Sequence, residues 1–232
     1  VVGVVVFQCL GGLVGALILN RQFPGRALVR GLALIPWATP SVLVALMWTW
    51  MLDGNYGLVN DLLVKAGILS RFQPWLAQPW SALPAVMLAD VWQGIPFFAV
   101  MLLAALQAIP EDLFEAARID GASPWRVFRH ITLPLLLPTI LITTMLRMIW
   151  TANYMDLIMI MTGGGPGYSS LTIHLHAYYM AYKRLDFGYG ATFFDMENDG
   201  DADLYWLGSD IASGAGPGGD VFPAAGRLLR GD

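Results

Sequence analysis

Long apolar stretches alternate with short polar segments along the first 160 or so residues of the chain. A helix needs about 20 mostly apolar residues to cross a bilayer, and four stretches are about that long. They cover residues 1–19, 32–52, 80–109 and 134–161. The first has neither a Met start nor a basic beginning, so we interpret it as a span of a truncated chain and not as a signal peptide. The pattern predicts an all-α membrane protein with about four transmembrane helices.

Composition favours a membrane protein over a soluble one. Of the 232 residues, 56% are hydrophobic and 13% are charged, whereas globular chains carry about 25% charged residues. So few charges cannot keep a folded surface in water, and lipid must cover much of it. The same figures exclude an intrinsically disordered chain. Cys9 is the single cysteine, which excludes an internal disulfide framework.

Six arginines are concentrated in two of the connecting loops. They are Arg21, Arg26 and Arg30 in residues 20–31, and Arg118, Arg126 and Arg129 in residues 110–133. Because Lys and Arg near span ends tend to remain in the cytoplasm, both loops are predicted to be cytoplasmic. Residues 53–79 and the segment after the fourth span then face outward. The predicted location is an inner or plasma membrane, with several crossings and an extracytoplasmic tail.

The loop between the third and fourth predicted spans carries the signals of two short helices. Pro110 suits the start of the first helix, and Gly121 supplies a left-handed stop. Ser123 then caps a second helix, which is predicted to end at Leu133-Pro134. This loop is therefore predicted to be folded.

The second predicted helix of this loop carries an apolar stripe of Trp125, Phe128 and Ile131. A helix that lies on lipid headgroups would favour a mostly basic polar face. Here four acids alternate with three arginines. The mixture favours docking onto a protein partner over contact with headgroups.

The same loop resembles that of a known family. It matches the EAA loop of permease subunits of binding-protein-dependent ABC importers. The matching positions are Glu115-Ala116-Ala117, then Gly121 after three residues, Ile131 after nine more, and Leu133-Pro134 after one more. In that family the loop is a coupling helix that fits a cleft on the ATP-hydrolysing subunit. The resemblance implies ATPase-coupling roles for Glu115, Ala116, Ala117 and Gly121. It also implies three kinds of partner: ATPase subunits, a second permease subunit and an extracytoplasmic solute-binding protein.

The resemblance covers residues 1–190, and its details are similar to the carbohydrate branch of the family. Three stretches are similar to segments of sugar and polyol permeases: RGLALIPWATPSVLVALMWTWMLDGNYGLVN, DVWQGIPFFAVMLLAALQAIP and MTGGGPGYSSLTIHLHAYYMAYKRLDFGYG. Members usually have six spans, so the resemblance implies one more before Val1 and one after Gly190. It implies a transport subunit without enzyme activity or cofactor in this part, since a partner hydrolyses ATP.

Charged residues inside the predicted spans have two interpretations. Charges within a bilayer are costly, so Asp90, Arg147 and Asp156 either pair structurally, snorkel to an interface or line a polar path. In the last case aromatic and polar side chains would join them along the route of a hydroxylated solute, although Trp is also an ordinary interfacial anchor. The candidates for this substrate path are Asp90, Trp92, Trp150, Asn153 and Tyr154.

Motifs for other chemistry are scarce. His174 and His176 lie two residues apart, but no Cys or acid stands at the spacing of a zinc site, so we interpret them as loop residues. The sequence holds no GxSxG, HExxH, Walker A or CxxC motif, which argues against a protease or a self-sufficient ATPase. Nothing in the composition indicates nucleic-acid binding.

Residues 191–232 form a short acidic tail of a different kind. They hold two Lys/Arg against eight Asp/Glu, while residues 1–190 hold eleven against nine. Short apolar runs that resemble strands flank an acidic loop, and the segment resembles the calcium loop of FG-GAP-type β-propeller repeats. The candidate ligands for Ca²⁺ are Asp195, Glu197, Asp199, Asp201 and Asp203. The alternative is a solvated acidic linker without an ordered site.

Two other functions compete with that of a permease. In one, the spans anchor an extracellular calcium-binding or adhesion module formed by the tail. In the other, the chain is a non-functional chimera of two genes joined near residues 187–191. An anchor has no use for the coupling pattern in residues 110–134. The sequence therefore favours a permease subunit that forms part of the path for a sugar or a similar polar solute.

Overall fold

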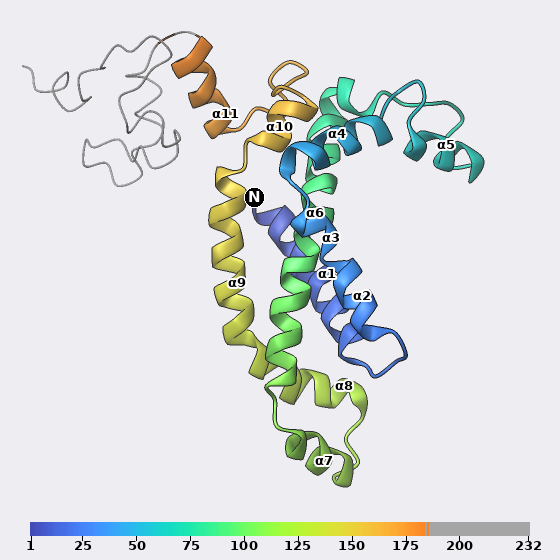
Figure 1. Ribbon diagram of the computed structural model, residues 1–232, viewed down its shortest axis with the longest axis vertical. Coiled ribbons are helices and arrows are strands. Elements are labelled where there is room, and N and C mark those ends of the chain that lie inside the picture. Colours follow the sequence, from blue (N-terminus) through green and yellow to red (C-terminus); the bar gives the residue numbers. More distant parts are fainter. Residues whose placement is uncertain (184, 186–232) are drawn as a thin grey trace, which may run out of the picture. The chain divides into compact units, whose positions relative to one another are not determined.

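The computed structural model describes residues 1–183 and 185, and its regular elements within them are helices. The chain divides into two units, Val1–Ser170 and Leu171–Asp232. The first contains α1 Val2–Asn20, α2 Arg26–Ala33, α3 Ile35–Ala38, α4 Ser41–Met51, α5 Leu58–Lys65, the 3-10 helix η1 Trp75–Ala77, α6 Pro79–Gln107, α7 Glu111–Ile119, α8 Pro124–Val127, the π-helix η2 Phe128–Thr132, α9 Leu133–Asn153 and α10 Asp156–Met161 (Figure 1). The second contains α11 Ile173–Tyr178 and the π-helix η3 Tyr179–Lys183.

Within the part of the chain that the structure describes, three helices are long and apolar enough to cross a membrane. They are α1, α6 and the continuous helix Pro124–Asn153, which joins α8, η2 and α9. A bent pair, Arg26–Ala38 with Ser41–Met51, makes a fourth crossing if it is counted as one span. The multi-span helical fold predicted from hydropathy is therefore confirmed.

The second predicted span, residues 32–52, is not one straight helix. It begins earlier, at Arg26, and a bend of 91° separates its two arms. The residue before a proline is driven toward extended geometry, and Thr39 adopts φ −76° and ψ 131° ahead of Pro40. Hydropathy treats Pro40 as one more uncharged position, so the prediction missed this break.

The fourth predicted span, residues 134–161, differs from the observed helix at both ends. The helix begins at Pro124 and stops at Asn153, after which Tyr154 is extended and α10 starts anew. Pro134 does not end the preceding helix, because η2 forms a π-helical turn just before it. A wider turn accommodates the ring of the proline and its missing N–H group.

Glycines let α1 approach α6 closely. A Cβ on Gly12 would overlap Phe98, and a Cβ on Gly11 would lie 2.9 Å from the side chain of Ile95. Inside lipid no hydrophobic force drives helices together, so small residues and close van der Waals contact hold them. Toward the end of this interface, buried side chains of α1, α6 and α9 form one cluster: Ala16, Leu19, Leu102, Leu103, Leu106 and Leu136.

The segment between α4 and α6 is folded around one side chain, the fully buried Asn60 of α5. Its Nδ2 donates to the carbonyls of Asp53 and Gln73 at 2.8 and 2.9 Å. Its Oδ1 accepts from the Gln73 N–H at 3.0 Å and from the Trp75 indole at 2.9 Å. All four hydrogen-bonding positions of the amide are thus used, which fixes the backbone around it.

The connections of the first unit lie at two opposite ends of its long helices (Figure 1). The turn after α1 and the α7–α8 loop share one end, and α5 and α10 share the other. The two arginine-rich loops, residues 20–31 and 110–133, therefore lie at the same end, as the distribution of arginines predicted. Which side of the membrane each end faces stays a prediction.

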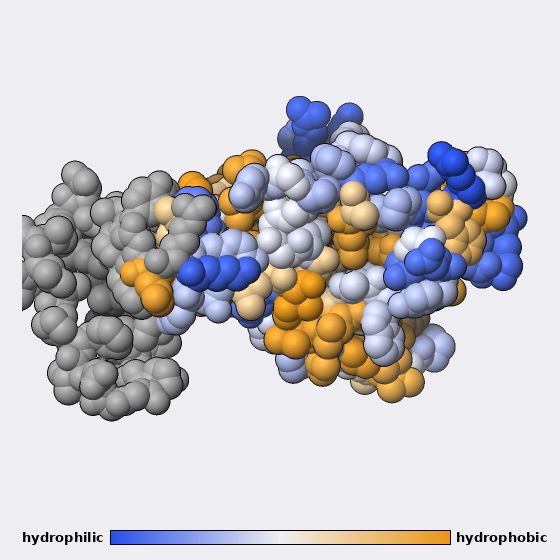
Figure 2. Space-filling view, turned by 90° about the horizontal axis from the view of Figure 1, so that it is seen from above, coloured by the Kyte–Doolittle hydropathy of each residue, from blue (hydrophilic) through white to orange (hydrophobic). Residues whose placement is uncertain are grey.

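Large apolar side chains reach the surface of the first unit. Figure 2 shows several of them gathered on the side of the helices that is visible from above. On α1 the exposed set is Val2, Val6, Phe7, Leu10, Val14 and Ile18. Such a surface is costly in water and is expected where a helix contacts lipid or another membrane chain.

Candidate functional site

The candidate coupling loop consists of α7 and the helix that begins at Pro124. Pro110 stands directly before α7 with ψ 135°, so it separates this helix from the long α6. Glu111 and Asp112 lie in the first turn of α7 and Arg118 lies in the last. Each charge therefore sits at the helix end that its sign stabilises.

Gly121 closes α7 with the left-handed geometry predicted for it. Its φ is +68°, and the next N–H, of Ala122, donates to the carbonyl of Ala117 at 2.9 Å. A side chain at Gly121 would meet nothing within 4 Å. Glycine is needed here for its backbone conformation and not for space.

Three of the four residues assigned to ATPase coupling lie on the surface. Glu115, Ala116 and Gly121 are exposed, whereas Ala117 is buried. Ala117 therefore supports the loop from inside and does not share the exposed face with the other three. In the sequence, these four residues are grouped only by the spacing of the motif.

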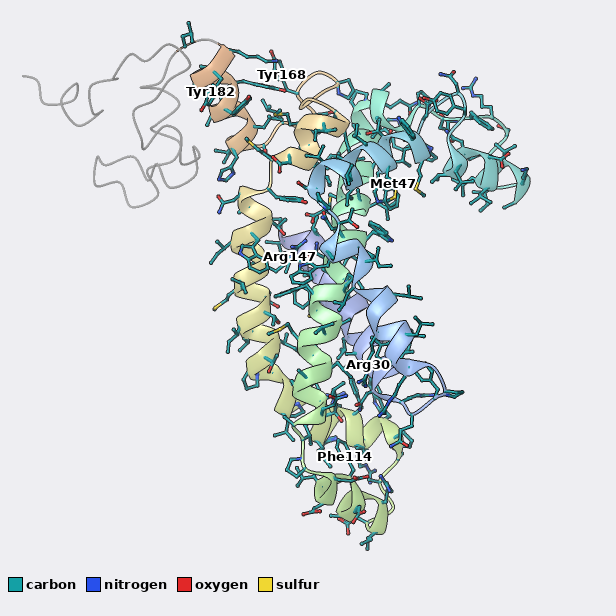
Figure 3. All side chains as sticks on the ribbon, viewed as in Figure 1. Arg30, Met47, Phe114, Arg147, Tyr168 and Tyr182 are labelled. Atoms are coloured by element: carbon teal, nitrogen blue, oxygen red, sulfur yellow. The ribbon has the colours of Figure 1, made fainter. Side chains whose placement is uncertain are left out.

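Large apolar side chains flank the exposed residues Glu115, Ala116 and Gly121. Ile119, at the end of α7, is 87% exposed, and Trp125 on the following helix is also exposed. Figure 3 labels Phe114, which lies on the same helix as Glu115 at the far end of the first unit. Exposed large apolar side chains beside charges, on a folded loop, are typical of a contact with another protein.

The second half of the loop is a helix that continues into the membrane. Ser123 Oγ accepts a hydrogen bond from the Arg126 N–H at 3.4 Å, as predicted for a cap. The Trp125 ring stacks on Phe128 with centroids 5.7 Å apart. The expected end at Leu133-Pro134 is wrong, because η2 leads directly into α9.

A buried polar network joins three of the long helices. The Arg147 Nη2 of α9 donates to Asp90 Oδ1 of α6 at 3.0 Å, and its Nε donates to Gln8 Oε1 of α1 at 2.8 Å. Gln8 Nε2 in turn donates to the backbone carbonyl and to Oδ1 of Asp90 at 2.9 and 3.2 Å. Asp90 and Arg147 are 6% and 8% exposed. The label of Arg147 in Figure 3 marks where this network lies along the long helices.

Gly94 makes room for this network. A Cβ there would overlap the Gln8 amide and would lie 2.7 Å from Arg147 Nη2. Neither Gln8 nor Gly94 is among the residues predicted from the sequence. A signal for Gln8 was present, since it is an amide within an otherwise apolar span, but nothing in the sequence marks Gly94 among the glycines.

A second set of hydrogen bonds links the two helix breaks to α6. The buried Gln93 donates from Nε2 to the Thr39 carbonyl at 3.1 Å and accepts from the Tyr154 hydroxyl at 2.8 Å. Thr39 stands at the α3–α4 break and Tyr154 at the α9–α10 break. Ser41 Oγ, just beyond the first break, donates to Asp156 Oδ2 at 3.0 Å.

The five candidates for the substrate path do not form one cluster. Trp92 packs edge-on against Trp48 at 6.0 Å, and its position on α6 is about 200° around the helix from Asp90. Trp150 packs against Phe97 at 5.3 Å, and the Asn153 amide donates to the carbonyl of its own helix at Ile149. Tyr154 reaches α6 through its hydrogen bond to Gln93, three positions after Asp90.

Residues 1–183 bring no group of three or more His, Cys, Asp or Glu side chains together in the way a metal site needs. His174 and His176 lie on α11 and not in a loop, contrary to the expectation. Partial burial lowers the pKa of the His174 imidazole, which favours the neutral ring. The acids proposed for calcium, Asp195, Glu197, Asp199, Asp201 and Asp203, lie outside the described residues.

Known sequences similar to this chain are permease proteins. Over 180 residues the chain is 45% identical to the trehalose/maltose transport system permease protein MalF of Thermococcus litoralis, covering 78% of this chain and 60% of that protein. It is 39% identical over 180 residues to the sulfoquinovosyl glycerol transport system permease protein SmoG of Agrobacterium fabrum, covering 78% and 58%. The chain thus spans about three-fifths of the length of these relatives.

A solved structure shares the fold. In the crystal structure of a bacterial alginate ABC transporter in complex with an alginate pentasaccharide-bound periplasmic protein, one chain matches with a TM-score of 0.72 at 23% identity. The match covers 82% of this chain and 66% of that one. Residues 9–191 also match the sequence profile described as binding-protein-dependent transport system inner membrane component, and the chain belongs to this family.

Proposed function

We propose that this chain is a permease subunit of an ABC importer, that it forms part of the membrane path for a sugar or similar polar solute, and that it couples to an ATPase subunit through α7. The observation that carries the proposal is the folded loop at one end of the spans. It exposes Glu115 and Ile119 on a short helix that Gly121 closes.

The chemistry of α7 suits a cleft on a protein partner. The exposed carboxylate of Glu115 can pair with a basic side chain at the rim, and Ile119 can enter an apolar pocket. Gly121 lets the chain turn without adding bulk at the contact. Ala117 keeps α7 packed against its own chain and acts on coupling only through the position of this helix.

The names of the relatives support a carbohydrate as the solute. They include transport proteins for trehalose/maltose, sulfoquinovosyl glycerol and diacetylchitobiose. Within this chain, the exposed Trp150 and the partly exposed Tyr154 contact α6 at Phe97 and Gln93, and they offer a sugar a ring and a hydroxyl oxygen that can accept a hydrogen bond. We assign Asp90 and Arg147 a structural role as an ion pair and not a place in the solute path, because each already neutralises the charge of the other.

The proposed assembly has a second permease subunit, ATPase subunits on the side of α7 and a solute-binding protein on the side of α5. The family is one of inner membrane components of binding-protein-dependent systems, and the related alginate transporter was crystallised with its periplasmic protein. A membrane anchor for an adhesion module gains no support from a family match across residues 9–191.

Substitutions in the complete importer test the coupling role. In proteoliposomes, Gly121→Val and Glu115→Lys should lower solute-stimulated ATP hydrolysis and uptake together, while the amount of permease in the membrane stays the same. Gly67→Val is a matched control, since Gly67 also ends a helix with positive φ, +74°, and a Cβ there also meets nothing within 4 Å. Both valine variants carry the same backbone strain.

The comparison between the two glycines decides the outcome. Loss of coupling at Gly121 with normal coupling at Gly67 supports docking through α7. Equal loss in both variants, with normal binding of the solute-binding protein to Gly67→Val, indicates a general cost of folding. Normal hydrolysis and uptake in both Gly121→Val and Glu115→Lys would remove α7 from the coupling mechanism.

A further inference from the structure

The turn that joins α1 to α2 carries positive charge without a balancing acid. Residues 20–31 contain Arg21, Arg26 and Arg30 and neither Asp nor Glu. Arg21 and Arg26 are exposed. Among the residues that the structure describes, the two ion pairs lie elsewhere, one within α5 and one between α6 and α9. No carboxylate of that part of the chain therefore neutralises the three arginines.

Arg30 is fixed at the end of α1. Its Nη2 donates to the Leu19 carbonyl at 3.0 Å, and the last carbonyls of a helix have no partner within it. Its Nε is buried and has no hydrogen-bond partner within the described part of the chain. Figure 3 labels Arg30 where α1 and α2 meet. The contact holds the start of α2, with Arg26 one turn earlier on the same face, close to Arg21.

The start of α2 is open to an anion. Gly25 precedes the helix with φ +81° and provides no side-chain cap, and the first turn contains no acid. A Cβ on Gly25 would meet nothing within 4 Å. The first N–H groups of a helix lack intrahelical partners and carry partial positive charge. Guanidinium groups and free N–H groups thus lie together, and both are donors that bind phosphate.

The two loops at this end of the first unit differ in charge. Residues 110–133 mix four acids with three arginines, whereas residues 20–31 are wholly basic. A mostly basic polar face is typical of a segment that contacts lipid headgroups. Figure 1 shows α7 farther out along the long axis than the turn between α1 and α2. The same criterion that favours a protein contact for α7 therefore favours headgroups for this turn.

The opposite face of α2 suits acyl chains. Leu28 and Leu32 are 68% and 55% exposed. At 3.6 residues per turn they lie across the helix from Arg26 and Arg30. One phospholipid can satisfy both faces, because its phosphate pairs with arginine and its acyl chains cover leucine.

We propose that residues 21–30 bind the headgroup of an anionic phospholipid in the leaflet at this end of the spans. Arg21, Arg26 and the open start of α2 contact the phosphate, and Arg30 positions them by holding α2 to α1. A zwitterionic lipid carries an ammonium group beside its phosphate, so a cluster of arginines attracts it less than a lipid of net negative charge. The inference goes beyond the proposed function and needs only a chain that lies in a membrane.

Native mass spectrometry of the full-length protein in detergent tests the proposal, with phosphatidylglycerol and phosphatidylcholine as probes. Phosphatidylglycerol should bind preferentially, and its affinity should fall as the salt concentration rises. The double variant Arg21→Gln with Arg26→Gln should bind it about 25-fold more weakly, because one arginine near an anionic surface contributes about fivefold. Lysine at both positions should keep most of the affinity, since it retains the charge. Arg30 stays unchanged, because its loss would also free the end of α1.

The double variant Arg118→Gln with Arg126→Gln is the matched control. It removes two positive charges at the same end of the first unit, and both residues are exposed. The control should bind phosphatidylglycerol as the unaltered protein does. An equal fall in the control would reduce the effect to overall charge and overturn the site. Equal binding of the two lipids by the unaltered protein, or full affinity in the variant at positions 21 and 26, would overturn it as well.

The assembled importer separates a lipid contact from a protein contact. Phosphatidylglycerol that stays bound when ATPase subunits are added supports the proposal. Its release on their binding would show that residues 21–30 belong to a protein contact, and the proposal would fall. If the lipid binds selectively but no ATPase subunit associates with the protein, the lipid site stands and the proposed function is wrong.

Discussion

Arg147 donates to the Asp90 carboxylate at 3.0 Å although the two residues are 57 positions apart and belong to different spans. Removing one partner of a buried ion pair leaves an uncompensated charge and costs about 3–5 kcal/mol. We expect this loss from Asp90→Asn or from Arg147→Met, measured as unfolding of the purified protein in mixed micelles.

The double variant Asp90→Leu with Arg147→Met removes both charges at once. It should be less destabilised than Asp90→Leu alone or Arg147→Met alone, because apolar side chains can replace a buried pair at little cost. Losses that simply add would contradict the prediction and would mean that each charge has its own partners.

A methyl group on Gly94 is predicted to disturb the same network. Gly94→Ala should destabilise the protein by about 1–3 kcal/mol, since the new Cβ overlaps the Gln8 amide and reaches Arg147. Gly31→Ala is the control, because Gly31 is also helical and a Cβ there meets nothing within 4 Å. The control should be neutral or gain up to about 1 kcal/mol. Equal effects in the two variants would show that Gly94 does not support the network.

The sequence predicted the long helices and the folded loop of residues 110–133 because their signals are local. Hydropathy marks α1 and α6, and Gly121 marks the end of α7 by the one backbone geometry that favours glycine. The partners of Gln8 and Asn60 lie on other elements, and no spacing rule connects Gln8 with positions 82 and 139 residues away. The two prolines also cannot be told apart from the sequence. Pro40 breaks its helix, whereas Pro134 does not, because a π-helical turn stands before it.

Cysteine labelling is predicted to place the two ends of the first unit on opposite sides of the membrane. On a Cys9→Ser background, Tyr56→Cys should react with an impermeant maleimide added to intact cells, and Ala116→Cys should react only after the cells are opened. Both positions are exposed in the folded chain, so access to the reagent depends on the side of the membrane. Labelling of position 116 from outside would reverse the topology.

Calcium binding is predicted for the acidic tail. Five acids at alternate positions from Asp195 to Asp203 repel one another unless a cation lies between them. In the full-length protein, Ca²⁺ should bind with a dissociation constant of roughly 10⁻⁴–10⁻³ M, as in extracellular modules, and should protect the tail from proteolysis. Mg²⁺ should substitute poorly, and Asp199→Ala should abolish both effects. Unchanged proteolysis with no calcium-specific heat in calorimetry would leave the tail as a solvated acidic linker.

The unbroken helix from Pro124 to Asn153 would give the proposed coupling loop a lever arm. At 1.5 Å per residue it is about 45 Å long, and a tilt of about 5° at the end that carries Trp125 would displace the other end by roughly 4 Å. That end carries Tyr154, whose hydroxyl is held by Gln93 through one hydrogen bond of 2.8 Å. A displacement of this size exceeds the reach of a hydrogen bond. If α7 docks as proposed, a tilt that overcomes the contacts of Arg147 with Asp90 and Gln8 would also break the hydrogen bond between Tyr154 and Gln93 at the opposite end of the span.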